Sequence, residues 1–262
     1  MHKWNPADYA RHSAAQLAWA RELVARLKLR GDESVLDIGS GDGKVSAEIA
    51  AALPEGRVVG LDGSQEMIEF ARANYGRERF ANLEFVCTDA RKIALQGLFD
   101  IVFSNAALHW IEDHLAVLSE MSRVLRSGGR IIISCGGRGN AVEIVEAFET
   151  VTARERWRTC FEGFPFPYHF YGPEEYSRWL PEAGLSPLRV ELAPKDMAHP
   201  GAEGLAAWVR TAWLPFTERV PESRREDLIQ EVVTEYLGRH PVDAAGNVHV
   251  RMVRLEAEGV KP

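Results

Sequence analysis

The sequence has few cysteines and no long hydrophobic run. Its three cysteines, Cys87, Cys135 and Cys160, lie far apart, unlike the short Cys-x-x-Cys pairs of zinc and redox sites. We therefore predict reduced, structural thiols and no metal site. The first ten residues lack the apolar core of a signal peptide, and no run approaches the roughly 18 apolar residues of a membrane span. The sequence thus predicts a cytoplasmic protein with no membrane partner.

An excess of positive charge is also missing. The chain carries 31 lysines and arginines against 38 acidic residues, which gives a formal net charge of −7. A protein with this balance has no general electrostatic attraction to the phosphate backbones of nucleic acids. We therefore expect a small-molecule substrate and no nucleic-acid partner. The composition leaves both a monomer and a dimer open.

The first half of the chain alternates short β-rich runs with helical patterns. An amphipathic helix is predicted over residues 13–29. Five strands are predicted at 34–38, 57–61, 83–86, 99–104 and 130–134, with helices between them at 44–53, 64–74 and 113–126. Strands joined by crossover helices pair in parallel with right-handed connections. This half therefore predicts a doubly wound α/β sheet.

The second half is less regular. A glycine-rich segment at 136–140 is followed by an arginine-rich helix, an aromatic loop at 160–171, a helix from Pro173 to about Gly184 and a strand at 188–192. Helices at 202–218 and 223–239 precede a seventh strand, in which Val248, Val250 and Met252 share one face. We predict one domain over 1–262, with an N-terminal helix and lid (1–32), a cofactor core (33–135), a helical and aromatic substrate cap (136–245) and the last strand (246–262).

The segment 35–43, Val-Leu-Asp-Ile-Gly-Ser-Gly-Asp-Gly, runs from a buried strand through a glycine-rich turn into a helix. Glycines allow the backbone to turn tightly and a ligand to lie against it. Asp62 ends the following strand, where a carboxylate can accept hydrogen bonds from both hydroxyls of an adenosine ribose. Strand, turn, helix, strand and acid together predict a nucleotide-type cofactor site.

The charges around this turn distinguish between cofactors. A dinucleotide places its pyrophosphate at the helix N-terminus, which favours anions. Asp37 and Asp42 flank that position and would repel a pyrophosphate, whereas they suit the ammonium and sulfonium groups of S-adenosylmethionine. The pattern therefore favours S-adenosylmethionine over NAD. An NAD-dependent oxidoreductase is the distant alternative, and a non-catalytic cofactor-binding protein of the same fold stays open.

Together with segments 87–90 (Cys-Thr-Asp-Ala), 103–110 (Phe-Ser-Asn-Ala-Ala-Leu-His-Trp) and 125–129 (Leu-Arg-Ser-Gly-Gly), these residues resemble the class I S-adenosylmethionine-dependent methyltransferases. The resemblance implies a Rossmann-like, seven-stranded and mostly parallel sheet whose last strand is antiparallel, and S-adenosylhomocysteine as the product. It implies that segment 37–43 surrounds the methionine part of the cofactor, that Asp62 holds the ribose, that Asp89 meets the adenine amino group and that Met67 packs on its ring. The cofactor contacts expected in this way are Asp37, Gly39, Ser40, Gly41, Gly43, Asp62, Gly63, Met67, Asp89, Ala90, Asn105 and Ala106.

More narrowly, segments 4–9 (Trp-Asn-Pro-Ala-Asp-Tyr) and 104–110 are similar to those of trans-aconitate methyltransferases, which esterify a carboxylate of a small acid. A carboxylate, with a pKa of roughly 4, is already ionised at neutral pH and needs no general base. We therefore expect a site of positioning groups and a cation. The candidate cations are Arg138 and His109, with Arg154, Arg156 and Arg158 as alternatives.

Further substrate contacts are predicted at Tyr9, Trp110 and Tyr171. An amine, a phenol or an acyl-carrier-bound malonate stays open as the acceptor. An amine or phenol would call for a general base, and His109 or His12 is then the first candidate catalytic residue.

Overall fold

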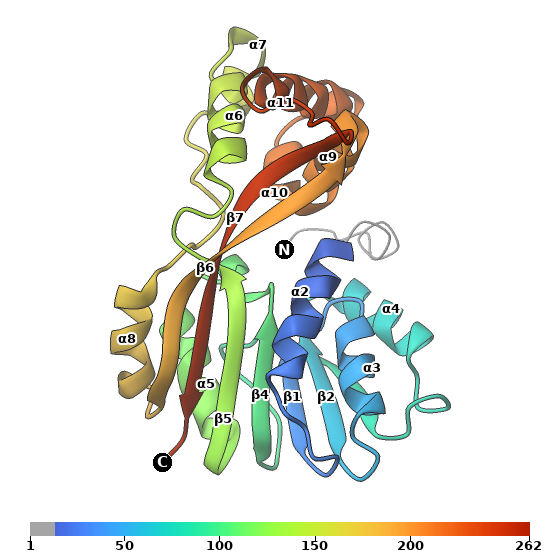
Figure 1. The fold of residues 1–262 in the computed structure, drawn as a ribbon, viewed down its shortest axis with the longest axis vertical. Helices are drawn as coiled ribbons and strands as arrows, with labels where there is room; N and C mark the ends of the chain where they lie inside the picture. The colour runs from blue at the N-terminus through green and yellow to red at the C-terminus, as the bar shows by residue number, and fades with distance from the viewer. Residues whose placement is uncertain (1–13) are drawn as a thin grey trace.

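A single seven-stranded sheet runs through the computed structural model, which describes residues 14–262. The strand order is β3-β2-β1-β4-β5-β7-β6 (Figure 1). The strands are β1 (Ser34–Ile38), β2 (Arg57–Asp62), β3 (Leu83–Cys87), β4 (Phe99–Asn105), β5 (Leu125–Gly136), β6 (Ser186–Pro200) and β7 (Asn247–Val260). The neighbours from β3 to β5 pair in parallel, and β7 is antiparallel to both β5 and β6. The predicted mostly parallel sheet with an antiparallel last strand is confirmed.

Helices on both faces cover the sheet and bury its central strands. Every residue of β1 is buried, as expected for a parallel strand packed on both sides. One core lies between the sheet and the helices α2 (Ala14–Ala25), α3 (Lys44–Ala51) and α4 (Gln65–Asn74). The other lies under α5 (His114–Val124) and α8 (Pro173–Glu182). The side chain of Ser64 caps α4, and that of Asp113 caps α5, by accepting a backbone N–H of the first turn.

The two long strands β6 and β7 extend beyond the sheet and carry a separate group of helices (Figure 1). This helical group consists of α6 (Val142–Thr152), α7 (Glu155–Phe161), α9 (Gly201–Ala212), α10 (Leu214–Thr217) and α11 (Arg225–Arg239). It has its own apolar core, built around Phe148, Trp157 and Tyr236, to which Val248 and Val250 of β7 contribute. The far ends of β6 and β7, called the β6–β7 arms below, are therefore part of this core.

Three elements differ from the sequence-based expectation. The strand expected at 188–192 is β6, which is much longer; it contains Pro187, Pro194 and Pro200, and prolines are tolerated there because β6 is an edge strand. The helix expected at 202–218 is split into α9 and α10, because Pro215 cannot donate a helical hydrogen bond. The expected arginine-rich helix is α7, and a separate helix without arginine, α6, precedes it. Within residues 14–262, no helix is both long and apolar enough to cross a membrane.

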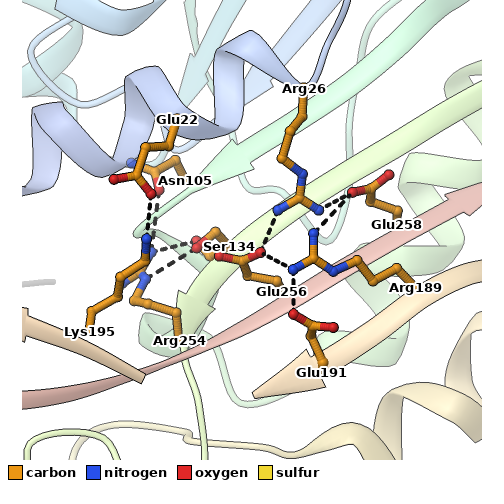
Figure 2. A network of polar contacts seen from close by, with 10 residues as sticks. All are labelled: Glu22, Arg26, Asn105, Ser134, Arg189, Glu191, Lys195, Arg254, Glu256 and Glu258. Carbon is orange, nitrogen blue, oxygen red and sulfur yellow. Dashed lines mark hydrogen bonds and ion pairs between the residues drawn. The ribbon is translucent and has the colours of Figure 1, made fainter. Parts of the chain in front are cut away.

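Ion pairs hold α2 against the β6–β7 arms (Figure 2). Arg26 pairs with Glu256 and Glu258 of β7, and Lys195 of β6 pairs with Glu22. Glu256 is buried, so its contact with Arg26 is shielded from solvent more than an ordinary surface pair is. One residue of α2, Trp19, lines the cavity described below.

Candidate functional site

A cavity of about 800 Å³ lies where the parallel strands end. Its size is in the range of ligand sites for a cofactor and a small molecule. One part, the strand-end half, is lined by the turns that follow β1 to β4. The other part, the aromatic half, is lined by α2, by the 3-10 turn η1 (Leu108–Trp110), by the loop before α8, and by α9, β6 and β7.

In the glycine-rich turn after β1, backbone without side chains forms part of the cavity wall. Gly39, Gly41 and Gly43 have φ values of +76°, +54° and +84°, a region that favours glycine. A Cβ on Gly39 would lie 2.0 Å from the Cβ of Ala107, so a larger residue does not fit there. A Cβ on Gly41 would meet nothing within 4 Å, although Gly41 lines the cavity. A ligand can therefore lie directly against this backbone.

Asp62, at the end of β2, is hydrogen-bonded to the glycine-rich turn after β1. Its carboxylate accepts hydrogen bonds from the N–H groups of Gly41 and Ser64, both at 2.9 Å. Burial raises the pKa of this carboxyl above its usual value. Because Asp62 also lines the cavity, it stands where the sequence predicts the ribose contact.

Asp37 lies behind the turn, on the wall of a second hollow of about 50 Å³ that Ser40, Gly41 and Asn105 also line. The carboxyl accepts a hydrogen bond of 2.6 Å from the hydroxyl of Ser46. Burial, together with the nearby charge of Asp62, raises its pKa to about 7. A cation bound in this hollow would stabilise the charged form of Asp37.

Asp42, the other acid expected to repel a pyrophosphate, pairs with Lys44 at 2.8 Å. Its charge is therefore partly balanced within the turn, and the argument from charge depends mainly on Asp37. Gly43, predicted as a cofactor contact, lines neither the cavity nor the hollow, because it caps the N-terminus of α3 against Phe85.

The remaining predicted cofactor residues meet in the strand-end half. Asp89 lies there with its carboxylate bound to the Arg91 guanidinium at 2.7 Å, which lowers the pKa of Asp89. Buried Met67 lies across from it, on α4. The cavity brings together Gly39, Gly41, Asp62, Gly63, Met67, Asp89, Ala90, Asn105 and Ala106.

His109 and Trp110, both predicted as substrate contacts, belong to η1 and line the aromatic half. His109 was also a candidate cation, and the structure corrects this. Its Nδ1 accepts the N–H of Gly136 at 3.3 Å, and burial together with the charge of Arg254 lowers its pKa to about 3. The imidazole is therefore neutral at physiological pH.

The other candidate cations lie outside the cavity. Arg138 is half-exposed and pairs with Glu175 of α8 at 2.6 Å. Arg154 and Arg156 pair with Glu231 of α11, within the helical group. These ion pairs join neighbouring elements of the chain: Arg138 to α8, and Arg154 and Arg156 to α11. Arg158 is likewise absent from the lining.

Tyr171 is not part of the cavity lining; its hydroxyl donates to the carbonyl of Glu112 and its ring packs on Trp179. Two predicted residues, Tyr9 and His12, lie outside the described residues, as does the segment 4–9. Among residues 14–262, no three His, Cys, Asp or Glu side chains are grouped as metal ligands are.

The cation that does line the cavity is Arg254 of β7, which the sequence analysis did not name. Its side chain is buried, with 4% exposed. The guanidinium donates to the carbonyl of Ser134 at 2.8 Å and to Oδ1 of Asn105 at 3.3 Å (Figure 2). It also lies over the ring of Trp19. The signal in the sequence was an arginine on the same face of the strand as Val248, Val250 and Met252.

Comparison with known proteins agrees with this arrangement. A family model described as a methyltransferase domain matches residues 29–184. The chain is also 32% identical to a trans-aconitate 2-methyltransferase of Deinococcus radiodurans over 224 residues, which cover 83% of each chain. The chain belongs to the methyltransferase family.

Solved methyltransferase structures share its fold. A phosphoethanolamine N-methyltransferase of Haemonchus contortus, in complex with S-adenosylhomocysteine, has a TM-score of 0.62 and 18% identity over 98% of this chain and 57% of its own. A geranyl diphosphate C-methyltransferase of Streptomyces coelicolor, also bound to S-adenosylhomocysteine, has a TM-score of 0.55 and 16% identity, and covers 94% of this chain and 79% of its own.

S-adenosylmethionine is the cofactor of this methyltransferase, and the described residues fit it. The backbone at Gly41, where a Cβ would meet nothing within 4 Å, leaves room for the methionine part of the cofactor. The carboxylate of Asp62 at the end of β2 suits the ribose, and the buried carboxyl of Asp37 suits the ammonium group. The hydroxyl of Ser40 is buried without a hydrogen-bond partner among the described residues, and it lines the same small hollow as Asp37. Such an orphan is typical of a polar atom that a ligand satisfies.

Proposed function

We propose that this methyltransferase transfers its methyl group to a carboxylate oxygen of a small organic acid. The observation that supports this most strongly is Arg254, a buried guanidinium in the wall of the cavity that also contains the expected cofactor residues. A buried positive charge at the edge of a ligand site favours an anionic ligand, because a buried carboxylate needs a partner of opposite charge. The similar protein of Deinococcus radiodurans is named for an organic acid, which agrees with this proposal.

The chemistry requires mainly positioning. When bound, S-adenosylmethionine supplies an electrophilic methyl group on a positively charged sulfur. The protein has to hold an acceptor oxygen in line with that methyl group and to exclude water. A carboxylate, with a pKa of roughly 4, arrives already ionised, so no side chain has to remove a proton.

Arg254 is built to orient such an acceptor. Its guanidinium donates to Ser134, within β5, and to Asn105, the last residue of β4. A guanidinium held in one orientation offers a carboxylate a charge-assisted hydrogen bond in a fixed direction. The position beside Asn105 places the acid next to the strand-end half, where the cofactor is expected.

His109 fits a positioning role better than a general base. With Nδ1 accepting from Gly136, the neutral ring carries its proton on Nε2 and can donate a hydrogen bond. A pKa of about 3 makes it a weak proton acceptor. His169, which also lines the cavity, is the residue to test if the acceptor is an amine or a phenol.

The proposal is tested with methyl-labelled S-adenosylmethionine and panels of organic acids, amines and phenols. An ester product is expected, from which mild alkali releases the label as methanol. Alkali-stable label on an amine or a phenol, with none on any acid, would refute the proposal.

Substitution of Arg254 adds a second test. Arg254→Met should lower kcat/KM for the acid about 10- to 100-fold, the scale of a lost hydrogen bond to a charged group, and Arg254→Lys should lower it less. Binding of S-adenosylhomocysteine by both variants checks that the fold is intact. Arg138→Met, which changes an exposed arginine outside the cavity, is the matched control and should leave kcat/KM unchanged. Equal kcat/KM values in the Arg254 and Arg138 variants would contradict the assigned role.

A further inference from the structure

The 3-10 turn η1 lies where the two halves of the cavity meet. Asn105 and Ala106, just before it in the chain, line the strand-end half, whereas His109 and Trp110 line the aromatic half. An acceptor bound against η1 therefore lies beside the residues expected to hold the cofactor. The position of this turn sets how the acceptor meets the methyl group, and a misplacement of about 1 Å can cost roughly 100-fold in rate.

The backbone that leads into η1 is strained. Ala106 has a φ of +58°, in the left-handed region that a residue with a Cβ rarely adopts. Its N–H donates to the carbonyl of Ser134 at 2.7 Å, which fixes the start of the segment. A conformation of this kind persists only when the surrounding structure holds it. The far side of the segment, η1 itself, therefore needs contacts that keep it in place.

His114, the first residue of α5, makes such a contact. Its Nε2 lies 2.8 Å from the carbonyl oxygen of Leu108, with which η1 begins, and its Nδ1 lies 2.7 Å from the hydroxyl of Tyr176 on α8. Burial lowers the pKa of His114 to about 4, so the ring is neutral at physiological pH and carries one proton. A carbonyl can only accept, so that proton is on Nε2, and Tyr176 donates to Nδ1.

This hydrogen-bonded chain is buried behind η1. His114 and Tyr176 are 1% and 0% exposed, and neither residue lines the cavity. The imidazole packs edge-on against the rings of Tyr171 at 4.7 Å and Tyr176 at 5.7 Å, which restricts its orientation. A buried polar network whose members are all paired holds its elements in one arrangement. The network therefore ties η1 to α5 and α8.

From these contacts we propose that His114 is a positioning residue for methyl transfer and that Tyr176 sets its tautomer. The chain from the Tyr176 hydroxyl through the imidazole to the Leu108 carbonyl holds η1 against the strain at its start. It thereby keeps His109 and Trp110 in place beside the cofactor. This inference applies to a carboxylate, an amine or a phenol acceptor alike, so it goes beyond the proposed function and does not depend on it.

The first test needs no acceptor. Tyr176→Phe removes the hydroxyl and keeps the ring. Tyr236→Phe is the matched control, because Tyr236 is 1% exposed and its hydroxyl donates to the carbonyl of His249 at 2.7 Å, within the helical group. Nitrogen-15 NMR of histidine rings and tryptophan indoles, with S-adenosylhomocysteine bound, should show wild-type His114 protonated at Nε2. The signals of His109 and Trp110 should shift in Tyr176→Phe and stay in place in Tyr236→Phe.

The second test measures kcat with the compound of the acid, amine and phenol panels that takes up label fastest. His114→Leu removes the donor to Leu108 and should lower kcat about 10- to 100-fold. His114→Gln offers an amide N–H near the position of Nε2 and should restore most of the loss. Tyr176→Phe should lower kcat about 3- to 10-fold, and Tyr236→Phe should leave it unchanged. The Kd of S-adenosylhomocysteine should stay within about twofold in all four variants.

The outcomes separate this inference from the proposed function. A proton on Nδ1 of His114, or unshifted His109 and Trp110 signals in Tyr176→Phe, would overturn it. Equal kcat values in the two tyrosine variants, or in His114→Gln and His114→Leu, would reduce the network to a contribution to stability. Label on amines or phenols alone refutes the proposed function and leaves this inference standing, because both tests run without an acid.

Discussion

Cofactor binding should strengthen as the pH rises towards neutrality, because Asp37 has to ionise to bind an ammonium group. Its carboxyl is 2% exposed, and burial together with Asp62 raises its pKa to about 7. A carboxyl with a raised pKa is neutral below that value and charged above it. The ammonium of S-adenosylhomocysteine favours the charged form, so the affinity should follow the ionised fraction of Asp37.

The size of the effect follows from that fraction. The apparent Kd equals the intrinsic Kd divided by the fraction of protein in the competent form, so it should fall about tenfold from about pH 5 to about pH 6 and level off above about pH 7. Isothermal titration calorimetry with S-adenosylhomocysteine over this range measures it. Adenosine, which keeps the ribose and lacks the amino acid part, controls for titration of Asp62 and should show a much weaker dependence.

The substitution Asp37→Asn removes the negative charge of the side chain and keeps its shape. The amide keeps an oxygen that can accept the hydrogen bond of Ser46, which is 2.6 Å long in the wild type. At about pH 7 the variant should bind S-adenosylhomocysteine about 10- to 100-fold more weakly, and its Kd should no longer depend on pH in this range. A wild-type Kd that is flat from pH 5 to 7, or an Asn variant with the wild-type slope, would refute the reasoning.

Three further outcomes are expected. Asp62→Ala removes the acceptor at the end of β2 and should weaken binding of S-adenosylhomocysteine by roughly 1–3 kcal/mol in calorimetry; unchanged affinity would contradict the ribose assignment. Gly43→Ala places a Cβ at a φ of +84°, 2.7 Å from the ring of Phe85, and should lower the free energy of unfolding by about 1–3 kcal/mol in urea denaturation; a wild-type midpoint would argue against strain at this turn. Arg138→Ala breaks an exposed pair with Glu175 and should change stability by less than about 1 kcal/mol with kcat/KM unaffected; a large loss of activity would restore Arg138 as a substrate contact.

The parts of the fold that could be predicted from the sequence are those set by neighbours in the chain. Strand, glycine turn and helix follow one another within residues 34–51, and their order alone predicts the site at the end of β1. Asp62 could be placed because parallel pairing sets the ends of adjacent strands side by side. The predictions of the sheet, of the family and of the cofactor are confirmed. The roles of individual site residues stay predictions.

The aromatic half could not be predicted, because it is assembled from distant segments. Arg254 donates hydrogen bonds to Ser134 and Asn105, which precede it by 120 and 149 residues. Arg138 was predicted as a substrate contact because it follows the fifth strand in the sequence. In the structure its guanidinium donates a hydrogen bond to Glu175 of α8 instead. An arginine within an alternating apolar strand was the available signal, since buried charge is rare without a partner. Trp208 and Trp213 looked like ordinary core residues and reach the cavity only because the β6–β7 arms carry α9 to it.

The pairing of β7 with β5 fixes the distance between Arg254 and the apolar side chains of β7 in the cavity wall. Arg254 lies opposite Gly136, and Met252 is two residues further along the same face of β7, about 7 Å away at the pitch of an antiparallel strand. The spacing between the guanidinium and the apolar wall of the cavity is therefore set by backbone hydrogen bonds, which side-chain substitutions do not alter. Acceptors of another length require a change of register or of loops, whereas acceptors of another shape require only new side chains on an unchanged frame.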